Sequence, residues 1–189
     1  MSAAGQPEIW IVRHGATEWS GSGRHTGRTD IPLTPDGVNQ AAEVVRPLAA
    51  HRFSQVLTSP LARARDTARI AGFADAQLDE DLLEWDYGTY EGRTTADIRT
   101  KRPGWTIWSD DVPGGETADE VAVRVERVIA RAGAADGDTL LFAHGHVLRI
   151  LTAVYLQLRA VDGARFKLGT AAIGVLGWEH EYHSLTRWS

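Results

Sequence analysis

The sequence Ile9-Trp10-Ile11-Val12-Arg13-His14-Gly15 places four apolar residues directly before an arginine, a histidine and a glycine. A short apolar run of this kind predicts a buried strand. Two later segments repeat the arrangement: Gln55–Thr58 leads into Ser59-Pro60-Leu61-Ala62-Arg63, and Thr139–Ala143 leads into His144-Gly145-His146. Each of these three predicted strands therefore ends at side chains capable of chemistry.

Segments with helix-start signals lie between the predicted strands. Thr34-Pro35 combines an N-cap residue with proline at the first helical position, and Pro47 is expected to kink that helix or end it early. Ser59-Pro60 repeats the signal for a helix that runs to about Gly72, and Thr117–Glu120 forms a capping box. Alternating strands and helices predict a single-domain layered α/β fold, with a mostly parallel central sheet flanked by helices.

The outermost of these patterns set the expected boundaries of the domain. We expect one domain over residues 1–189, with a core of about 9–178 and an irregular segment of about 94–116 that forms a pocket wall. Trp105 and Trp108 lie in that segment, and one of them is expected near the mouth of the pocket. The other predicted elements are a short strand at 76–78, a helix at about 147–158, a strand at 173–178 and an edge strand at 182–185.

The composition is that of one globular domain. The chain has 189 residues, of which 43% are hydrophobic, enough for a sizeable core. The absence of cysteine excludes disulfides, zinc–thiolate sites and thiol nucleophiles. A net charge of −5 argues against a nucleic-acid or membrane-surface partner. The sequence has neither a signal peptide nor an apolar run of membrane-spanning length, so we expect a cytoplasmic protein.

The residues that follow the three strands suit a phosphate group. In parallel sheets, ligands bind beyond the carboxyl ends of the strands. The guanidinium groups of Arg13 and Arg63 match phosphate in charge and geometry, and Arg63 lies in a first helical turn, where free N–H groups also favour an anion. An isolated arginine would more often form a surface salt bridge, so the argument rests on two arginines beside two histidines.

His14 is the candidate nucleophile. A neutral ring nitrogen can attack phosphorus, and Gly15 lets the backbone approach closely, so that a carbonyl can hold the other nitrogen protonated. His144, also followed by glycine, can donate to phosphoryl oxygens as charge builds. Taken alone, either histidine is more often a core or surface residue with satisfied hydrogen bonds.

Glu84 is the candidate proton donor. It lies between Leu83 and Trp85, and desolvation by such neighbours raises the pKa of a carboxyl group. A raised pKa suits a group that protonates the leaving oxygen. A buried structural glutamate fits the same surroundings nearly as well, and both interpretations stay open.

Landmarks in a fixed order resemble the histidine phosphatase superfamily, in its phosphoglycerate-mutase-like branch. These landmarks are Val12–Trp19, Gly27–Thr34, Thr58–Ala64, Glu84–Gly92, Gly114–Thr117 and Ala143–Arg149. The resemblance implies that His14 becomes a phosphohistidine, that Arg13, Arg63 and His144 bind the phosphoryl group, and that Glu84 acts as general acid and then base. It also implies that no metal or organic cofactor is needed.

The resemblance extends to the substrate contacts, with departures. The family uses the loop at Thr26 and Gly27 to contact phosphate. Ser20 stands where the family often has asparagine, and His146 stands where mutases commonly have asparagine. The expected substrate-binding residues are Ser20, Thr26, Gly27, Gly145, His146, Trp105 and Trp108. The wall between Glu84 and Glu116 is shorter than in glycolytic mutases, which favours hydrolysis over transfer.

The sequence therefore predicts a phosphatase that hydrolyses a small phosphorylated metabolite, such as a sugar phosphate, through a phosphohistidine. It looks most similar to sedoheptulose-bisphosphatase-type and actinobacterial acid-phosphatase-type members. The alternatives are a phosphoglycerate mutase and a non-catalytic phosphate-binding module. His144, His146, His180 and His183 lack a completing carboxylate motif, so no metal site is expected. A homodimer is left open.

Overall fold

A six-stranded sheet forms the centre of the computed structural model, which describes residues 6–189. The strands are β1 (Ile9–Arg13), β2 (Gln55–Thr58), β3 (Gln77–Leu78), β4 (Thr139–Ala143), β5 (Ile173–Glu179) and β6 (Tyr182–Trp188). Their order is β3-β2-β4-β1-β5-β6; the first four are parallel, and β5 and β6 are antiparallel to their neighbours. The predicted single-domain α/β fold with a mostly parallel sheet is confirmed.

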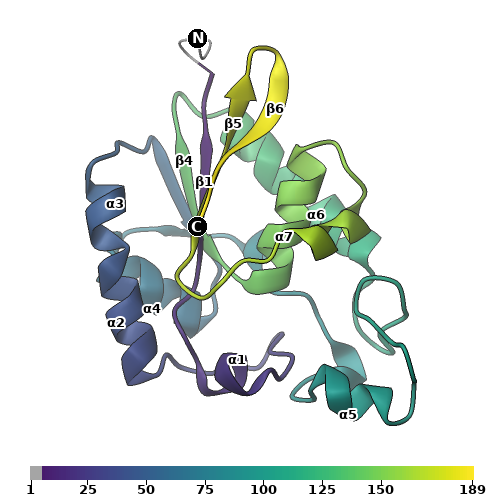
Figure 1. Cartoon of the computed structure of the whole chain (residues 1–189). Helices are drawn as coiled ribbons and strands as arrows, with labels where there is room; N and C mark the ends of the chain where they lie inside the picture. Colours follow the sequence, from purple (N-terminus) through teal and green to yellow (C-terminus); the bar gives the residue numbers. More distant parts are fainter. Residues whose placement is uncertain (1–5) are drawn as a thin grey trace.

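Helices cover both faces of this sheet (Figure 1). One face carries α2 (Pro35–Glu43), α3 (Val45–Ala49) and α4 (Ala62–Ile70), and the other carries α6 (Ala118–Gly133) and α7 (Gly145–Tyr155). Alternate residues of β4 supply the two cores: Leu140 and Phe142 pack towards Leu48, whereas Leu141 packs towards Val125. The period of two follows from the alternating side chains of a strand.

Five short elements complete the chain. They are α1 (Glu18–Ser22), α5 (Thr95–Arg99) and three 3₁₀ helices, at Glu80–Leu82, Gly88–Tyr90 and Ala160–Arg165. Both α1 and α5 lie at the end of the molecule where β1 finishes (Figure 1). The predicted irregular segment of 94–116 therefore begins with a helix, for which Thr94 and Asp97 form a capping box.

The helix boundaries confirm one detail of the prediction and correct another. The first helix breaks at Val44, because Pro47 has no N–H to donate to the carbonyl of Glu43, and a second helix, α3, then contains the proline. Ser59-Pro60 does not cap α4, which begins at Ala62 after Leu61 without a side-chain cap. The hydroxyl of Ser59 has a different partner, described below.

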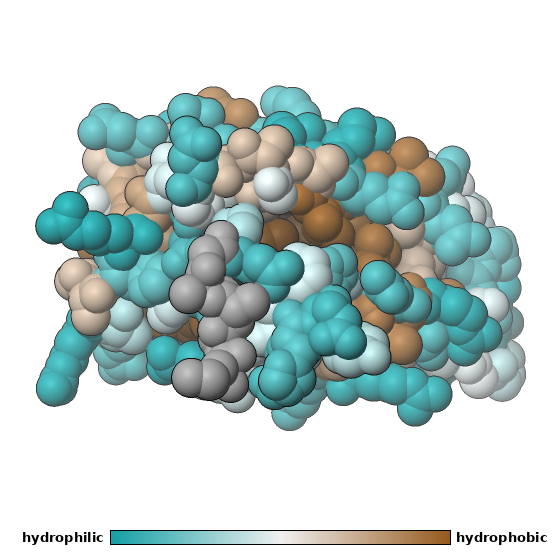
Figure 2. Space-filling view, turned by 90° about the horizontal axis from the view of Figure 1, so that it is seen from above, coloured by the Kyte–Doolittle hydropathy of each residue, from teal (hydrophilic) through white to brown (hydrophobic). Residues whose placement is uncertain are grey.

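The core also extends beyond the predicted limit of 178, because β6 runs to Trp188. The first five residues, which the predicted domain included, lie outside the described residues. Among residues 6–189, no helix combines the length and the apolar character needed to cross a membrane. Figure 2 looks down on the end of the molecule where β1 begins; hydrophilic residues make up most of this face, with hydrophobic residues showing between them.

Candidate active site

The carboxyl ends of β1, β2 and β4 meet at one edge of the sheet and bring the predicted residues together. The backbone N–H of His14 donates to Ala143 O at 3.0 Å, and that of Ser59 donates to Phe142 O at 2.9 Å. As a result, the rings of His14 and His144 lie with their centroids 5.2 Å apart. The site residues lie close together because these neighbouring strands are parallel and end at the same edge of the sheet, as the sequence pattern predicts.

His14 is buried and held in one tautomer. Its Nδ1 lies 2.7 Å from the carbonyl oxygen of Gly15, which can only accept, so Nδ1 carries the proton and Nε2 is left with a lone pair. Burial lowers the pKa of His14 well below its usual value, and the charges of Arg13 and Arg63 lower this pKa further. The ring is therefore neutral at physiological pH.

Arg63 is buried completely, and the loop before α2 holds its side chain. Its terminal nitrogens donate to the carbonyls of Thr29 at 2.9 Å, Thr26 at 3.1 Å and Gly27 at 2.9 Å. Its Nε donates to Nδ1 of His144 at 3.0 Å. Burial lowers the pKa of Arg63, and the negative charge of Glu84 counteracts that effect. The guanidinium is thus fixed as a positive charge beside the two histidines.

His144 is neutral and its tautomer is opposite in sense to that of His14. Because Nδ1 accepts from Arg63, the ring proton is on Nε2, which donates to the hydroxyl of Ser59 at 2.7 Å. Burial, followed by the charge of Arg63, lowers the pKa of His144 well below its usual value. Ser59 was not predicted as a site residue, since the Ser-Pro pair resembled a helix cap. The sequence signal that could have identified Ser59 as a site residue is its position directly after β2.

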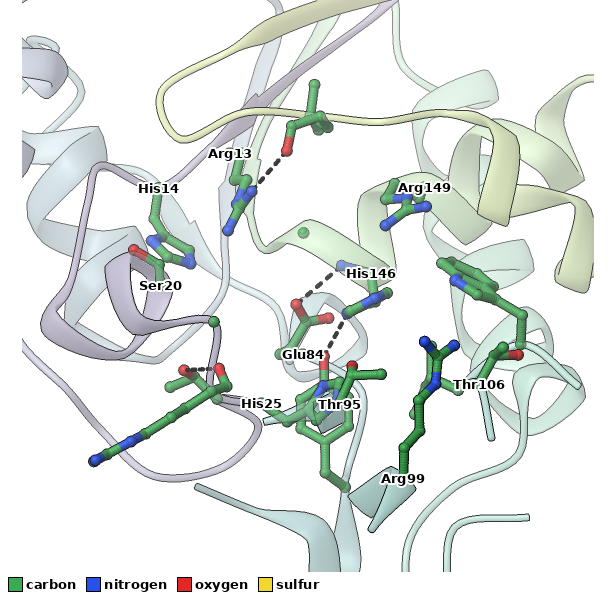
Figure 3. A pocket seen from close by; sticks show the side chains of 18 residues that line it. Arg13, His14, Ser20, His25, Glu84, Thr95, Arg99, Thr106, His146 and Arg149 are labelled. Carbon is green, nitrogen blue, oxygen red and sulfur yellow. Dashed lines mark hydrogen bonds between the residues drawn. The ribbon is translucent and has the colours of Figure 1, made fainter. Parts of the chain in front are cut away.

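Glu84 lies at the N-terminus of α7 and borders a cavity that His14 also lines. Its Oε1 accepts from the backbone N–H groups of Trp85 at 2.9 Å and Val147 at 2.8 Å, and its Oε2 accepts from that of His146 at 3.0 Å (Figure 3). Free N–H groups and the helix dipole favour a carboxylate at this place. The geometry accommodates both the structural and the catalytic interpretation of this residue.

Arg13 reaches the cavity from the end of β1. One terminal nitrogen donates to Leu168 O at 2.6 Å, while its Nε is buried and has no hydrogen-bond partner among the described residues. A Cβ at Gly145 would lie 3.4 Å from this guanidinium, so the glycine leaves space beside it. Burial lowers the pKa of Arg13, against the opposing charge of Glu84.

The cavity has a volume of about 420 Å³ and runs from His14 to the segment after α5 (Figure 3). Its lining includes Arg13, His14, Ser20, Arg24, His25, Thr26, Glu84, Tyr87, Thr95, Arg99, Thr106, Trp108, Gly145, His146, Arg149 and Leu168. Arg63 and His144 do not border the cavity and are fully buried. Polar and cationic side chains therefore surround a space of the size used by small-molecule sites.

The sequence from residue 9 to residue 189 matches the family model of the histidine phosphatase superfamily, branch 1. The chain belongs to this superfamily. This membership confirms the resemblance stated from the landmarks, and with it the prediction of a hydrolase that acts on phosphorylated metabolites through a phosphohistidine.

Similar members of the superfamily carry phosphatase names. The chain is 38% identical to an acid phosphatase of Mycobacterium tuberculosis over 181 residues, covering 94% of this chain and 89% of the relative. It is 37% identical to sedoheptulose 1,7-bisphosphatase of Saccharomyces cerevisiae, covering 80% of this chain and 68% of the relative. A solved structure of an open reading frame product from Mycobacterium tuberculosis has a TM-score of 0.92 at 37% identity, with 96% of both chains covered.

Two predicted substrate contacts of this histidine phosphatase do not border the cavity. Trp105 is buried with 1% of its surface exposed, and its ring packs against Tyr90 at 5.1 Å; it is Trp108 that lines the cavity. The N–H of Gly27 is taken up by Glu91 at 2.9 Å, so it is not available to a phosphate. The other five predicted contacts lie at the cavity wall: Ser20, Thr26, Gly145, His146 and Trp108.

Two of those five have hydrogen bonds that define what they offer a ligand. The hydroxyl of Ser20 donates to Thr17 O at 2.9 Å and accepts from Thr17 N at 2.9 Å, as part of the cap of α1. Nδ1 of His146 lies 2.6 Å from the hydroxyl of Tyr87, which remains protonated because burial raises its pKa well above 10. Nδ1 of His146 is thus engaged by the protein, and its Nε2 has no hydrogen-bond partner among the described residues.

The histidines considered for a metal site are separated in the fold, while a different group comes together. Glu8, His51 and Asp138 offer ligand atoms that lie within 4.8 Å of one another at the amino ends of β1 and β4. All three have partners in the protein: His51 and Glu8 both bond to Asp138, and the indole of Trp10 donates to Glu8 at 3.0 Å. This group lies at the end of the sheet away from His14.

Proposed function

We propose that this chain hydrolyses a phosphorylated sugar or a related phosphomonoester, with His14 as the nucleophile. The observation that carries the proposal is the bond from His14 Nδ1 to the carbonyl of Gly15 at 2.7 Å. This bond leaves the lone pair on Nε2, and burial keeps the pKa of the ring low enough for that lone pair to stay free. A histidine protonated on both nitrogens would have nothing with which to attack phosphorus.

The reaction takes place in two displacements at phosphorus. When substrate is bound, the negative charge of its phosphoryl group favours the protonated form of Glu84. In the first displacement, Nε2 of His14 bonds to phosphorus as the bond to the ester oxygen breaks, and protonated Glu84 gives its proton to that oxygen. In the second, water attacks the phosphohistidine and Glu84 takes up the proton of the water. Inorganic phosphate leaves, and His14 and Glu84 return to their starting states.

The basic residues around His14 balance the charge of the phosphoryl group. Arg13 is the direct contact, since it lines the cavity and its second terminal nitrogen has no hydrogen-bond partner among the described residues. Arg63 and His144 donate to protein acceptors, so they act chiefly as a fixed charge and a fixed ring behind the nucleophile. Such preorganised groups stabilise developing charge without rearrangement.

The proposed substrate class is supported by the relatives and by the cavity. Both curated relatives described above are named as phosphatases, one of them for a sugar bisphosphate. The cavity of about 420 Å³ is large enough for a phosphorylated sugar and carries polar side chains to bind its hydroxyl groups.

The test is phosphate release from a panel of phosphorylated sugars, with His14→Ala as the variant and His180→Ala as the matched control. His180 is an exposed histidine outside the cavity. We expect His14→Ala to lose activity by orders of magnitude and His180→Ala to match the wild type. Retention of a tenth of the activity by His14→Ala contradicts the mechanism. A requirement for added bisphosphoglycerate, with isomerisation instead of phosphate release, would identify a mutase.

A further inference from the structure

Arg63 is fully buried, yet no carboxylate accepts a hydrogen bond from its guanidinium. Three backbone carbonyls of the loop 26–29 and the ring of His144 accept those bonds instead, at distances between 2.9 and 3.1 Å. A charge that is buried without a partner of opposite sign is costly. The position of this charge therefore depends on what holds the loop.

The carboxylate of Glu91 binds the same loop through its N–H groups. Its Oε1 accepts from the backbone N–H of Gly27 at 2.9 Å and from that of Thr29 at 3.1 Å, and its Oε2 lies 3.0 Å from the nitrogen of Gly27. The loop thus presents its carbonyls to a guanidinium and its N–H groups to a carboxylate. Hydrogen bonds with a charged partner are stronger than those between neutral groups.

One peptide unit joins the two charged side chains. The carbonyl oxygen of Thr26 accepts from a terminal nitrogen of Arg63 at 3.1 Å, and the N–H of the same unit, on Gly27, donates to Glu91. In a trans peptide the C=O and the N–H point in opposite directions, so the negative end of the peptide dipole faces the cation and the positive end faces the anion. Burial lowers the pKa of Arg63, and Glu91 is one of the negative charges that oppose this effect, after Glu84.

Backbone contacts hold Glu91 against the loop. It follows the 3₁₀ helix Gly88–Tyr90, whose first carbonyl accepts from the N–H of Glu91 at 3.2 Å. The N–H of the next residue, Gly92, donates to His25 O at 2.8 Å. A Cβ on Gly27 would lie 2.6 Å from Oε2 of Glu91, so the glycine admits the carboxylate at this short distance.

We propose that Glu91 is a positioning residue of the phosphatase, which fixes the guanidinium of Arg63 through the loop 26–29. Glu91 does not border the cavity, so it acts through Arg63 and not on the substrate. The inference rests on the proposed function, because Arg63 supplies a fixed charge to a reaction at His14. Preorganised charge stabilises the transition state more than the bound substrate, so loss of Glu91 should lower kcat and leave KM nearly unchanged.

Steady-state kinetics with p-nitrophenyl phosphate test this expectation. Glu91→Ala is expected to lower kcat by about tenfold, with KM changed by less than about twofold. Glu91→Gln should recover part of the loss, because its amide oxygen can still accept from the loop at the place of Oε1. Glu120→Ala is the matched control: Glu120 also accepts from a backbone N–H, that of Thr117 at 2.8 Å, but it caps α6 outside the cavity. This control should lose stability in urea and keep the wild-type kcat.

A double-mutant cycle shows whether Glu91 acts through Arg63. Glu91→Ala is measured in the wild type and in an Arg63→Gln background, where the guanidinium is absent. We expect its loss of kcat to disappear in that background, since a residue that acts only through Arg63 then has nothing left to position. Urea unfolding verifies that each variant is folded at the assay temperature. If Glu91→Ala does not fold, Glu91→Gln takes its place in the same cycle, because it keeps the shape of the side chain.

Failure of this inference differs from failure of the proposed function. A wild-type kcat in Glu91→Ala, a change confined to KM, or a loss of kcat that persists at the same size in the Arg63→Gln background each overturns the positioning role, even if His14→Ala is inactive. Activity that survives in His14→Ala overturns the proposed function, whatever the Glu91 variants do.

Discussion

The carbonyl oxygen of Gly37 lies 2.2 Å from the point that a Cβ on Gly15 would occupy. The start of α2 and the loop after β1 therefore touch through bare backbone, and this contact sets the position of the carbonyl that orients His14. Only glycine at residue 15 is compatible with it.

Gly15→Ala is accordingly expected to destabilise the protein by about 2–3 kcal/mol, because backbone must move to admit the methyl group. Turnover should fall at least about a hundredfold, since the ring of His14 loses its alignment. Denaturant unfolding and phosphate release measure the two effects. Gly21→Ala is the control: its Cβ would meet no atom within 4 Å, and in α1 it should be neutral or slightly stabilising. Wild-type turnover in Gly15→Ala would show that the contact is unimportant.

Glu84→Gln distinguishes the acid from a structural glutamate. A sugar alkoxide needs a proton to leave, whereas p-nitrophenolate leaves unaided, so the variant should lose far more activity on sugar phosphates than on p-nitrophenyl phosphate. The amide also presents an NH₂ group to one of the N–H donors around Glu84, so some stability is lost as well.

Burst kinetics must show that transfer to His14 limits both reactions, because slow hydrolysis of the phosphohistidine would hide the difference. Equal losses on the two substrates under that condition remove Glu84 from the role of acid.

The buried histidines make stability depend on pH. Burial lowers the pKa of His25 to about 4, from 6.5 in the unfolded chain. As the pH falls, the unfolded state therefore binds a proton at His25 before the folded state does. The contribution of neutral His25 to the free energy of unfolding, about 3 kcal/mol, is present above pH 6.5 and is lost as the pH falls to about 4.

Urea unfolding at pH 7, 5.5 and 4.5 measures this decline. His25→Gln should show a smaller decline than the wild type, whereas His180→Gln, at an exposed position, should keep the full decline. An unchanged pH dependence in His25→Gln would contradict the assignment. His14, His144 and His146, whose pKa values burial also lowers, contribute in the same direction.

Activity should survive dialysis against strong chelators. The positive charge at the phosphoryl position comes from Arg13 and Arg63, and the group formed by Glu8, His51 and Asp138 lies at the other end of the sheet. Phosphate release before and after treatment with EDTA is the measurement. Complete loss that a divalent ion restores would overturn the assignment.

The part of the site that follows the strands could be predicted from sequence, because apolar runs locate strands and parallel strands end at a common edge. These two patterns were sufficient to predict Arg13, His14 and His144 as residues of the site. Ser59 was missed because Ser-Pro before a helix is the usual cap signal, and only the neighbouring strand shows that its hydroxyl meets His144.

The other wall of the cavity could not be predicted in the same way. Trp105 and Trp108 are three residues apart, yet one is buried in the core and the other lines the cavity, because tertiary packing of an irregular segment decides which side faces inwards. Arg99 and Arg149 have the sequence context of solvent-exposed helical arginines. That neither arginine has a partner carboxylate within residues 6–189 can be seen only in the folded chain.

The side chain of Arg63 joins segments that are remote in sequence: its acceptors lie 34 to 37 residues before it, in the loop before α2, and 81 residues after it, at His144. Contacts of such long sequence separation form slowly during folding, after helices and local turns. Recovery of phosphatase activity during refolding should thus lag behind recovery of the far-ultraviolet circular dichroism signal. The return of enzymatic turnover during refolding therefore reports the last step of folding, in which these distant segments come together.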